Sequence, residues 1–113
     1  DGLLSGKPHP RAYGSFPKIL GRYVRELEVL TLQEAVHKMT KKAAQSFSIK
    51  DRGQLKEGYF ADIVIFDKDK VSGCDDYINS TQYPTGIDYV IINGNCVIEE
   101  NEYKHIKAGK VLR

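Results

Sequence analysis

The chain has 113 residues, of which 41% are hydrophobic and 28% are charged. This length and composition fit one domain with a real core, and they exclude a disordered, fibrous or membrane-embedded protein. With 17 basic and 15 acidic residues, the net charge of +2 is too small to favour a partner such as a nucleic acid or an anionic membrane, and we expect neither.

The first fifteen residues predict a loop, because they contain three glycines and two prolines. Ser15 is a predicted helix N-cap, with Pro17 in the first turn behind it. Apolar residues then recur at helical spacing, with charged residues on the opposite side. This pattern predicts an amphipathic helix over residues 16–28.

A second helix is predicted over residues 32–47. Thr31 and Glu34 have the spacing of a capping box at its start, and one apolar stripe follows. After this helix, the apolar residues no longer follow the helical period but form a short continuous run. Residues 61–66 are apolar on both faces except at Asp62, which is typical of a buried strand.

The last third of the chain is predicted to be a polar surface loop followed by antiparallel strands. Residues 67–86 form the loop. The pair Asn93-Gly94 separates two β-branched runs, which predicts a hairpin of residues 87–92 and 95–99 with a type I′ turn. Short strands are expected at 102–106 and 110–113. The fold class is therefore α+β, with two helices before the strands.

Residue pattern alone nominates few catalytic groups. His9, His37 and His105 are isolated in sequence, and we expect the last two to be solvated surface residues. Cys74 and Cys96 are spaced neither as a disulfide framework nor as a zinc half-site, which favours reduced thiols and a cytoplasmic protein. We expect Cys74 to be an ordinary thiol and Cys96 a small core residue.

The segment from Asp1 to Arg11 is the one place where loop chemistry favours function. An arginine can donate two parallel hydrogen bonds to a carboxylate, so Arg11 is a candidate for binding a carboxylate. A rigid loop in which Arg11 pairs with a neighbouring acid explains the same residues, and the residues alone favour that structural explanation.

Several segments of the chain resemble one family closely. Asp1-Gly2 and the stretches from His9 to Tyr23 and from Leu30 to Thr40 resemble the D-aminoacylase (N-acyl-D-amino-acid deacylase) family. The stretches from Asp51 to Gly53 and from Leu55 to Asp67 resemble the closing segment of the wider amidohydrolase superfamily, and residues 109–113 resemble the family's end.

The resemblance implies a zinc-dependent hydrolase of N-acyl-D-amino acids, built on a (β/α)8 barrel with a small β-domain. It assigns to Asp1 the activation of the attacking water and to Arg11 the binding of the substrate carboxylate. It assigns no role to His9. Metal ligands of the family lie on earlier barrel strands, so no metal ligand and no bound cofactor is expected in these 113 residues.

The resemblance also implies how the chain is divided. Residues 1–49 correspond to a loop and two helices from the end of the catalytic barrel, and residues 50–113 to strands of the small β-domain. Since the chain starts at Asp1 and its only methionine is Met39, we expect a longer parent protein. The fragment alone is expected to be inactive, and to self-associate because its partner surfaces are missing.

Two alternatives remain open from the sequence. One is a fragment of another amidohydrolase, such as a dihydroorotase- or hydantoinase-like cyclic amidase. The Arg11 segment argues against it, because a cyclic amide need not present the same free carboxylate. The other is a non-catalytic α+β interaction module.

Overall fold

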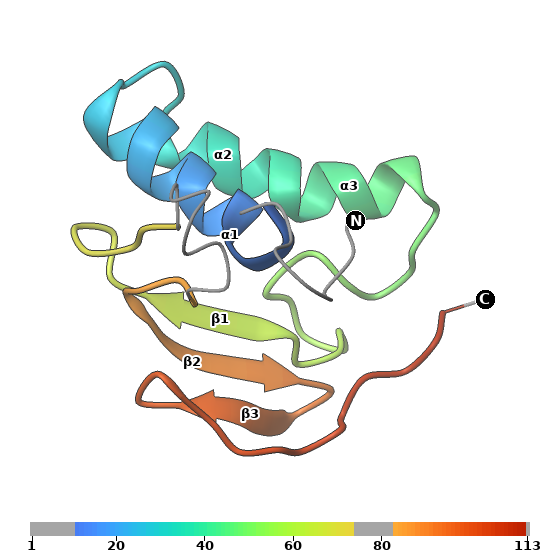
Figure 1. Cartoon of the computed structure of the whole chain (residues 1–113). Coiled ribbons are helices and arrows are strands. Elements are labelled where there is room, and N and C mark those ends of the chain that lie inside the picture. The colour runs from blue at the N-terminus through green and yellow to red at the C-terminus, as the bar shows by residue number, and fades with distance from the viewer. Residues whose placement is uncertain (1–10, 74–82, 113) are drawn as a thin grey trace. The chain divides into compact units, whose positions relative to one another are not determined.

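The computed structural model describes residues 11–73 and 83–112, with side chains from Gly14 onward (Figure 1). The chain forms two compact units. The first combines the segment up to Ala35 with Asp67–Gly86, and the second combines Val36–Phe66 with the segment from Ile87 onward. In the described ranges, no helix is both long enough and apolar enough to cross a membrane.

The first predicted helix begins earlier than its pattern indicates. It consists of α1 (Arg11–Lys18) and η1 (Ile19–Glu26), a stretch with π-helical hydrogen bonding. Ser15 lies inside α1, so the prediction that it is the N-cap is wrong. The residue before it, Gly14, forms a kink within α1, where φ is −147° and ψ is 23°. The helix ends near the predicted residue, because Glu28 adopts a positive φ of 52°.

The second predicted helix is divided in two. It forms α2 (Leu32–Met39) and α3 (Lys41–Ser46), separated by Thr40 with a non-helical φ of −118° and ψ of −90°. The Thr40 hydroxyl donates to the Val36 carbonyl at 2.6 Å, a bond to the preceding turn that bends helices. At the start of α2, the Thr31 hydroxyl accepts the Glu34 N–H and donates to the Glu34 carboxylate, both at 3.1 Å.

The second unit contains an antiparallel sheet in the order β1-β2-β3-β4 (Figure 1). Its strands are β1 (Ile63–Phe66), β2 (Ile87–Ile92), β3 (Asn95–Glu99) and β4 (Glu102–Tyr103). The Asn93-Gly94 turn has φ values of 50° and 81°, which confirms the type I′ hairpin. The α+β class, with helices before an antiparallel sheet, is confirmed.

Three strand predictions need correction. In β1, Val64 is 53% and Ile65 is 48% exposed, so the strand exists but is not buried: it is an edge strand of the sheet. The strand predicted at 102–106 ends at Tyr103, because His105 takes a left-handed φ of 57°. Residues 110–112 belong to no strand, and Arg113 lies outside the described residues.

The predicted surface loop of residues 67–86 contains the most deeply buried side chain of the described residues. Val71 is 0% exposed, and Ala35 of the same unit is 1% exposed. Ser72 pairs with Thr85 through two backbone hydrogen bonds of 3.1 and 3.0 Å. Residues 67–73 and 83–86 are therefore packed within the first unit, although their composition is largely polar.

Candidate functional site

The predicted site residues lie at and before the start of α1. Asp1 and His9 fall outside the described residues, as does Cys74. Arg11 is the first residue of α1, within the same unit as the loop Asp67–Gly86. A helix start leaves backbone N–H groups without partners inside the helix, and these groups and a guanidinium both favour an anion. That Arg11 binds a carboxylate stays a prediction.

The helix that begins at Arg11 is braced by the segment after Asp67. Arg25, in η1, donates from one nitrogen, Nη1, to two carbonyls, that of Lys68 at 3.0 Å and that of Val71 at 2.8 Å. A charged donor shared by two backbone acceptors holds the segment more firmly than neutral contacts do. Arg25 thus links the helix to the buried turn at Val71 through two hydrogen bonds.

Close backbone contact at Gly21 also holds the helix against the turn at Val71. Gly21 is buried in η1, and a Cβ atom placed on it would lie 2.6 Å from the Val71 carbonyl oxygen and 3.2 Å from the Ser72 Cα atom. A side chain at this position has no room, because both neighbours are backbone atoms. The helix and the segment 71–72 are therefore in direct main-chain contact.

A protein metal site needs several ligating side chains that can share one ion. Within residues 11–73 and 83–112, no three side chains of His, Cys, Asp or Glu gather as a possible metal site. The described residues thus offer no ligand set into which zinc would fit. That the ligands lie elsewhere in a longer protein stays a prediction.

The remaining candidate side chains have structural explanations. His37 and His105 are exposed, as predicted, and the His105 ring lies 4.6 Å from the Tyr103 ring. Cys96 is half-buried, and its thiol donates to the Ile98 carbonyl at 3.2 Å. Burial and the carboxylates of Glu100, Glu99 and Asp88 raise the pKa of Tyr89.

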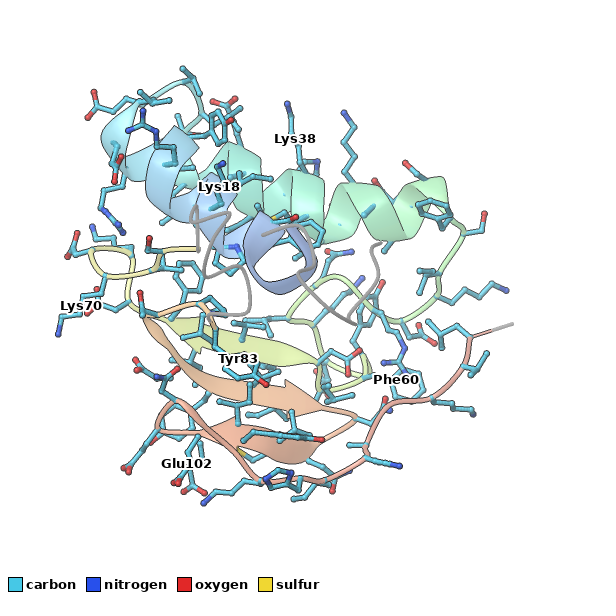
Figure 2. The ribbon with its side chains drawn as sticks, viewed as in Figure 1. Lys18, Lys38, Phe60, Lys70, Tyr83 and Glu102 are labelled. Carbon is cyan, nitrogen blue, oxygen red and sulfur yellow. The ribbon has the colours of Figure 1, made fainter. Side chains whose placement is uncertain are left out.

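Sequence reasoning missed a polar cluster in the second unit, centred on Arg52. The Arg52 side chain is 12% exposed and forms an ion pair with Asp62, which is 32% exposed. Its guanidinium also donates to the Asn93 side-chain oxygen at 2.7 Å, and its carbon Cζ lies 4.2 Å from the centre of the Phe60 ring (Phe60 is labelled in Figure 2). Stacking on an aromatic ring and a carboxylate partner together compensate a largely buried charge.

Asn93 extends this Arg52 cluster to two further segments. Its backbone N–H donates to the Asp62 carboxylate at 2.8 Å, and its side-chain amide donates to the Ala108 carbonyl at 2.7 Å. The cluster thus joins the residue before β1, the β2–β3 turn and the segment that follows β4. The signal that could have predicted it was Asp62, since a lone carboxylate in an apolar run requires a cation or donors.

Comparison with known proteins gives this site its context. A profile of the amidohydrolase family matches residues 5–98. The chain is 45% identical over 114 aligned residues, covering 100% of it, to an N-acyl-D-glutamate deacylase of Alcaligenes xylosoxydans xylosoxydans.

Two solved structures have the same fold. A crystal structure of D-aminoacylase superimposes with a TM-score of 0.93 and 40% identity over 98% of this chain. A crystal structure of N-acyl-D-glutamate deacylase from Bordetella bronchiseptica, complexed with zinc and a phosphonate inhibitor, superimposes with a TM-score of 0.83 and 44% identity over 86% of this chain. This chain spans only 23% of the Alcaligenes relative and 24% and 21% of the two crystallised proteins.

Proposed function

The chain belongs to the amidohydrolase family, and we propose that it forms the C-terminal part of a metal-dependent hydrolase that cleaves the amide of N-acyl-D-amino acids. The observation that carries the proposal is the identity to an N-acyl-D-glutamate deacylase along the whole chain. The fold supports it, because the described elements superimpose on the corresponding quarter of a D-aminoacylase.

Two residues of this chain would act on the substrate in the complete protein. Arg11, at the start of α1, would bind the substrate carboxylate and orient the amide. Asp1 would take a proton from the attacking water and pass it to the leaving nitrogen. When bound to the rest of the protein, zinc would supply the polarisation of the amide carbonyl.

The same proposal assigns a structural role to each part of the chain. Residues 1–49 would complete the catalytic barrel, and residues 50–113 would complete the small β-domain, in which the Arg52 cluster holds the strands and the last segment together. We also propose a cytoplasmic location, because Cys96 is a free thiol.

The proposal predicts that activity requires the complete protein. We expect the 113-residue chain alone to show no hydrolysis of an N-acetyl-D-amino acid and no stoichiometric zinc at micromolar metal. The complete protein is expected to hydrolyse the same compound and to lose this activity when a chelator removes its metal. Metal analysis and a ninhydrin assay of the released amine check both. Turnover by the short chain, or a complete protein inert with zinc bound, would contradict the proposal.

We further expect the isolated chain to self-associate through apolar side chains that the rest of the parent protein would cover. In the first unit, Phe16 is 62% and Leu27 is 45% exposed; in the second, Val64 is 53% and Ile65 is 48% exposed in edge strand β1. An exposed apolar edge strand is a template for pairing with a second copy.

Sedimentation velocity of the isolated chain tests this expectation. Val64→Lys is expected to shift the chain towards monomer, because a charge on an edge strand opposes pairing. Val111→Lys is the matched control, since Val111 is 76% exposed and lies outside the sheet. A wild-type chain that is monomeric at all concentrations would contradict the expectation.

A further inference from the structure

Gly73 makes the tightest approach between the loop and the helix that begins at Arg11. A Cβ atom placed on Gly73 would overlap the Gly14 carbonyl oxygen and would lie 2.9 Å from the backbone nitrogen of Lys18 (Lys18 is labelled in Figure 2). Both neighbours are main-chain atoms of α1. Even a methyl group at Gly73 must therefore displace the backbone of the loop or of the helix.

The point of contact on the helix is its kink. Gly14 is buried and has the non-helical φ of −147° within α1. The kink separates the turn that carries Arg11 from the remainder of α1 and from η1. The direction in which the first turn leaves the helix thus depends on the conformation of Gly14, whose carbonyl lies against Gly73.

The loop side of this contact is firmly held. Val71 is fully buried, and its carbonyl accepts the hydrogen bond from Arg25 at 2.8 Å. Ser72 is bonded in both directions to Thr85, and the Asp67 N–H donates to the Gly86 carbonyl at 2.8 Å. A side chain added at Gly73 meets a loop with several fixed hydrogen bonds on one side. On the other side it meets the Gly14 carbonyl, at the kink from which the first turn of α1 leaves the helix.

We propose that Gly73 is a positioning residue that sets the direction of the first turn of α1, and thereby the place of Arg11 relative to the substrate carboxylate. This inference rests on the proposed function, since it gives Gly73 its effect through Arg11. It predicts that a methyl group at Gly73 weakens recognition of the carboxylate, while the groups that cleave the amide remain in place.

The test compares Gly73→Ala and Arg11→Ala in the complete zinc-loaded protein, with an N-acetyl-D-amino acid and its carboxyl methyl ester as substrates. For the free acid, Gly73→Ala is expected to raise KM about tenfold and to change kcat less than about threefold. For the ester, kcat/KM should stay close to wild type. Gly109→Ala is the control, because a Cβ atom at Gly109 meets no atom within 4 Å.

The outcomes separate this inference from the proposed function. If Arg11→Ala does not change the preference for free acid over ester, the proposed role of Arg11 fails. If Arg11→Ala abolishes the preference but Gly73→Ala behaves like Gly109→Ala, or impairs both substrates equally, the positioning role of Gly73 is overturned.

A second variant tests the positioning role of Gly73 if the Gly73→Ala protein does not fold well enough to be purified. Arg25→Met keeps much of the side-chain length but removes both hydrogen bonds to the Lys68 and Val71 carbonyls, so the loop loosens beneath Gly73. A rise in KM for the free acid without a matching change for the ester supports the inference. Equal loss on both substrates, or no loss, overturns it.

Discussion

Replacing Arg11 by alanine in the complete protein is expected to lower kcat/KM for an N-acetyl-D-amino acid by roughly 30-fold to several thousand-fold. This range corresponds to about 2–5 kcal/mol for the loss of a desolvated, charge-assisted pair between guanidinium and carboxylate. The groups that cleave the amide remain, so a neutral substrate should be hydrolysed as before. Steady-state kinetics with the free acid and its methyl ester measure the difference directly.

Two controls make the Arg11 prediction specific. Arg11→Lys keeps the charge but loses the planar fork, and we expect it to recover only part of the activity. Esterifying the substrate should remove most of the difference between wild type and Arg11→Ala. If both proteins hydrolyse the free acid equally well, Arg11 is a structural residue of the helix start and does not bind substrate.

Replacing Arg52 by alanine is expected to lower the free energy of unfolding of the 113-residue chain by about 2–4 kcal/mol. The substitution leaves the partly buried Asp62 carboxylate without its cation and removes the donor to the Asn93 side chain. The expected loss is below that for a fully buried pair, because the Asp62 side chain is 32% exposed. Urea denaturation at a concentration where the chain is monomeric measures the loss.

Lys104→Ala is the matched control for the Arg52 prediction. The Lys104–Glu99 pair of the same unit is 3.6 Å apart, with side chains 41% and 52% exposed, and such pairs contribute less than about 1 kcal/mol. In a double-mutant cycle, Arg52→Ala and Asp62→Ala should show a coupling of about 1–3 kcal/mol. Additive effects of the two substitutions would show that the pair contributes nothing of its own.

The strongest local patterns predicted the fold well. Asn93-Gly94 determined the hairpin because its φ values of 50° and 81° suit few other residue pairs. The division of the second helix was not predictable from its apolar stripe, because the break depends on where the Thr40 hydroxyl finds an acceptor. The exposure of β1 was missed for a different reason. An apolar run indicates that a strand packs against other residues. It does not indicate whether those residues belong to this chain or to another part of a longer protein.

The candidate site shows the same limits. The resemblance to a family assigned roles to Asp1 and Arg11, but residue pattern alone favoured a structural loop there. Arg25 and Gly73 could not have been nominated, because their importance depends on the Val71 turn, which lies 46 residues from Arg25 in sequence and inside a polar segment. Asp62 was the one missed residue whose environment already indicated a partner.

The central claim is that this chain belongs to a hydrolase of N-acyl-D-amino acids, and one substrate panel tests it most directly. The complete zinc-loaded protein would be assayed with a panel of N-acetyl-D-amino acids, their L-enantiomers, dihydroorotate and a hydantoin, each followed by product identification. We expect hydrolysis of at least one N-acetyl-D-amino acid of the panel, with its L-enantiomer and both cyclic amides at least about 100-fold slower, since discrimination of that size needs about 2.7 kcal/mol. Faster opening of a cyclic amide, or faster cleavage of the L-enantiomer, would contradict it.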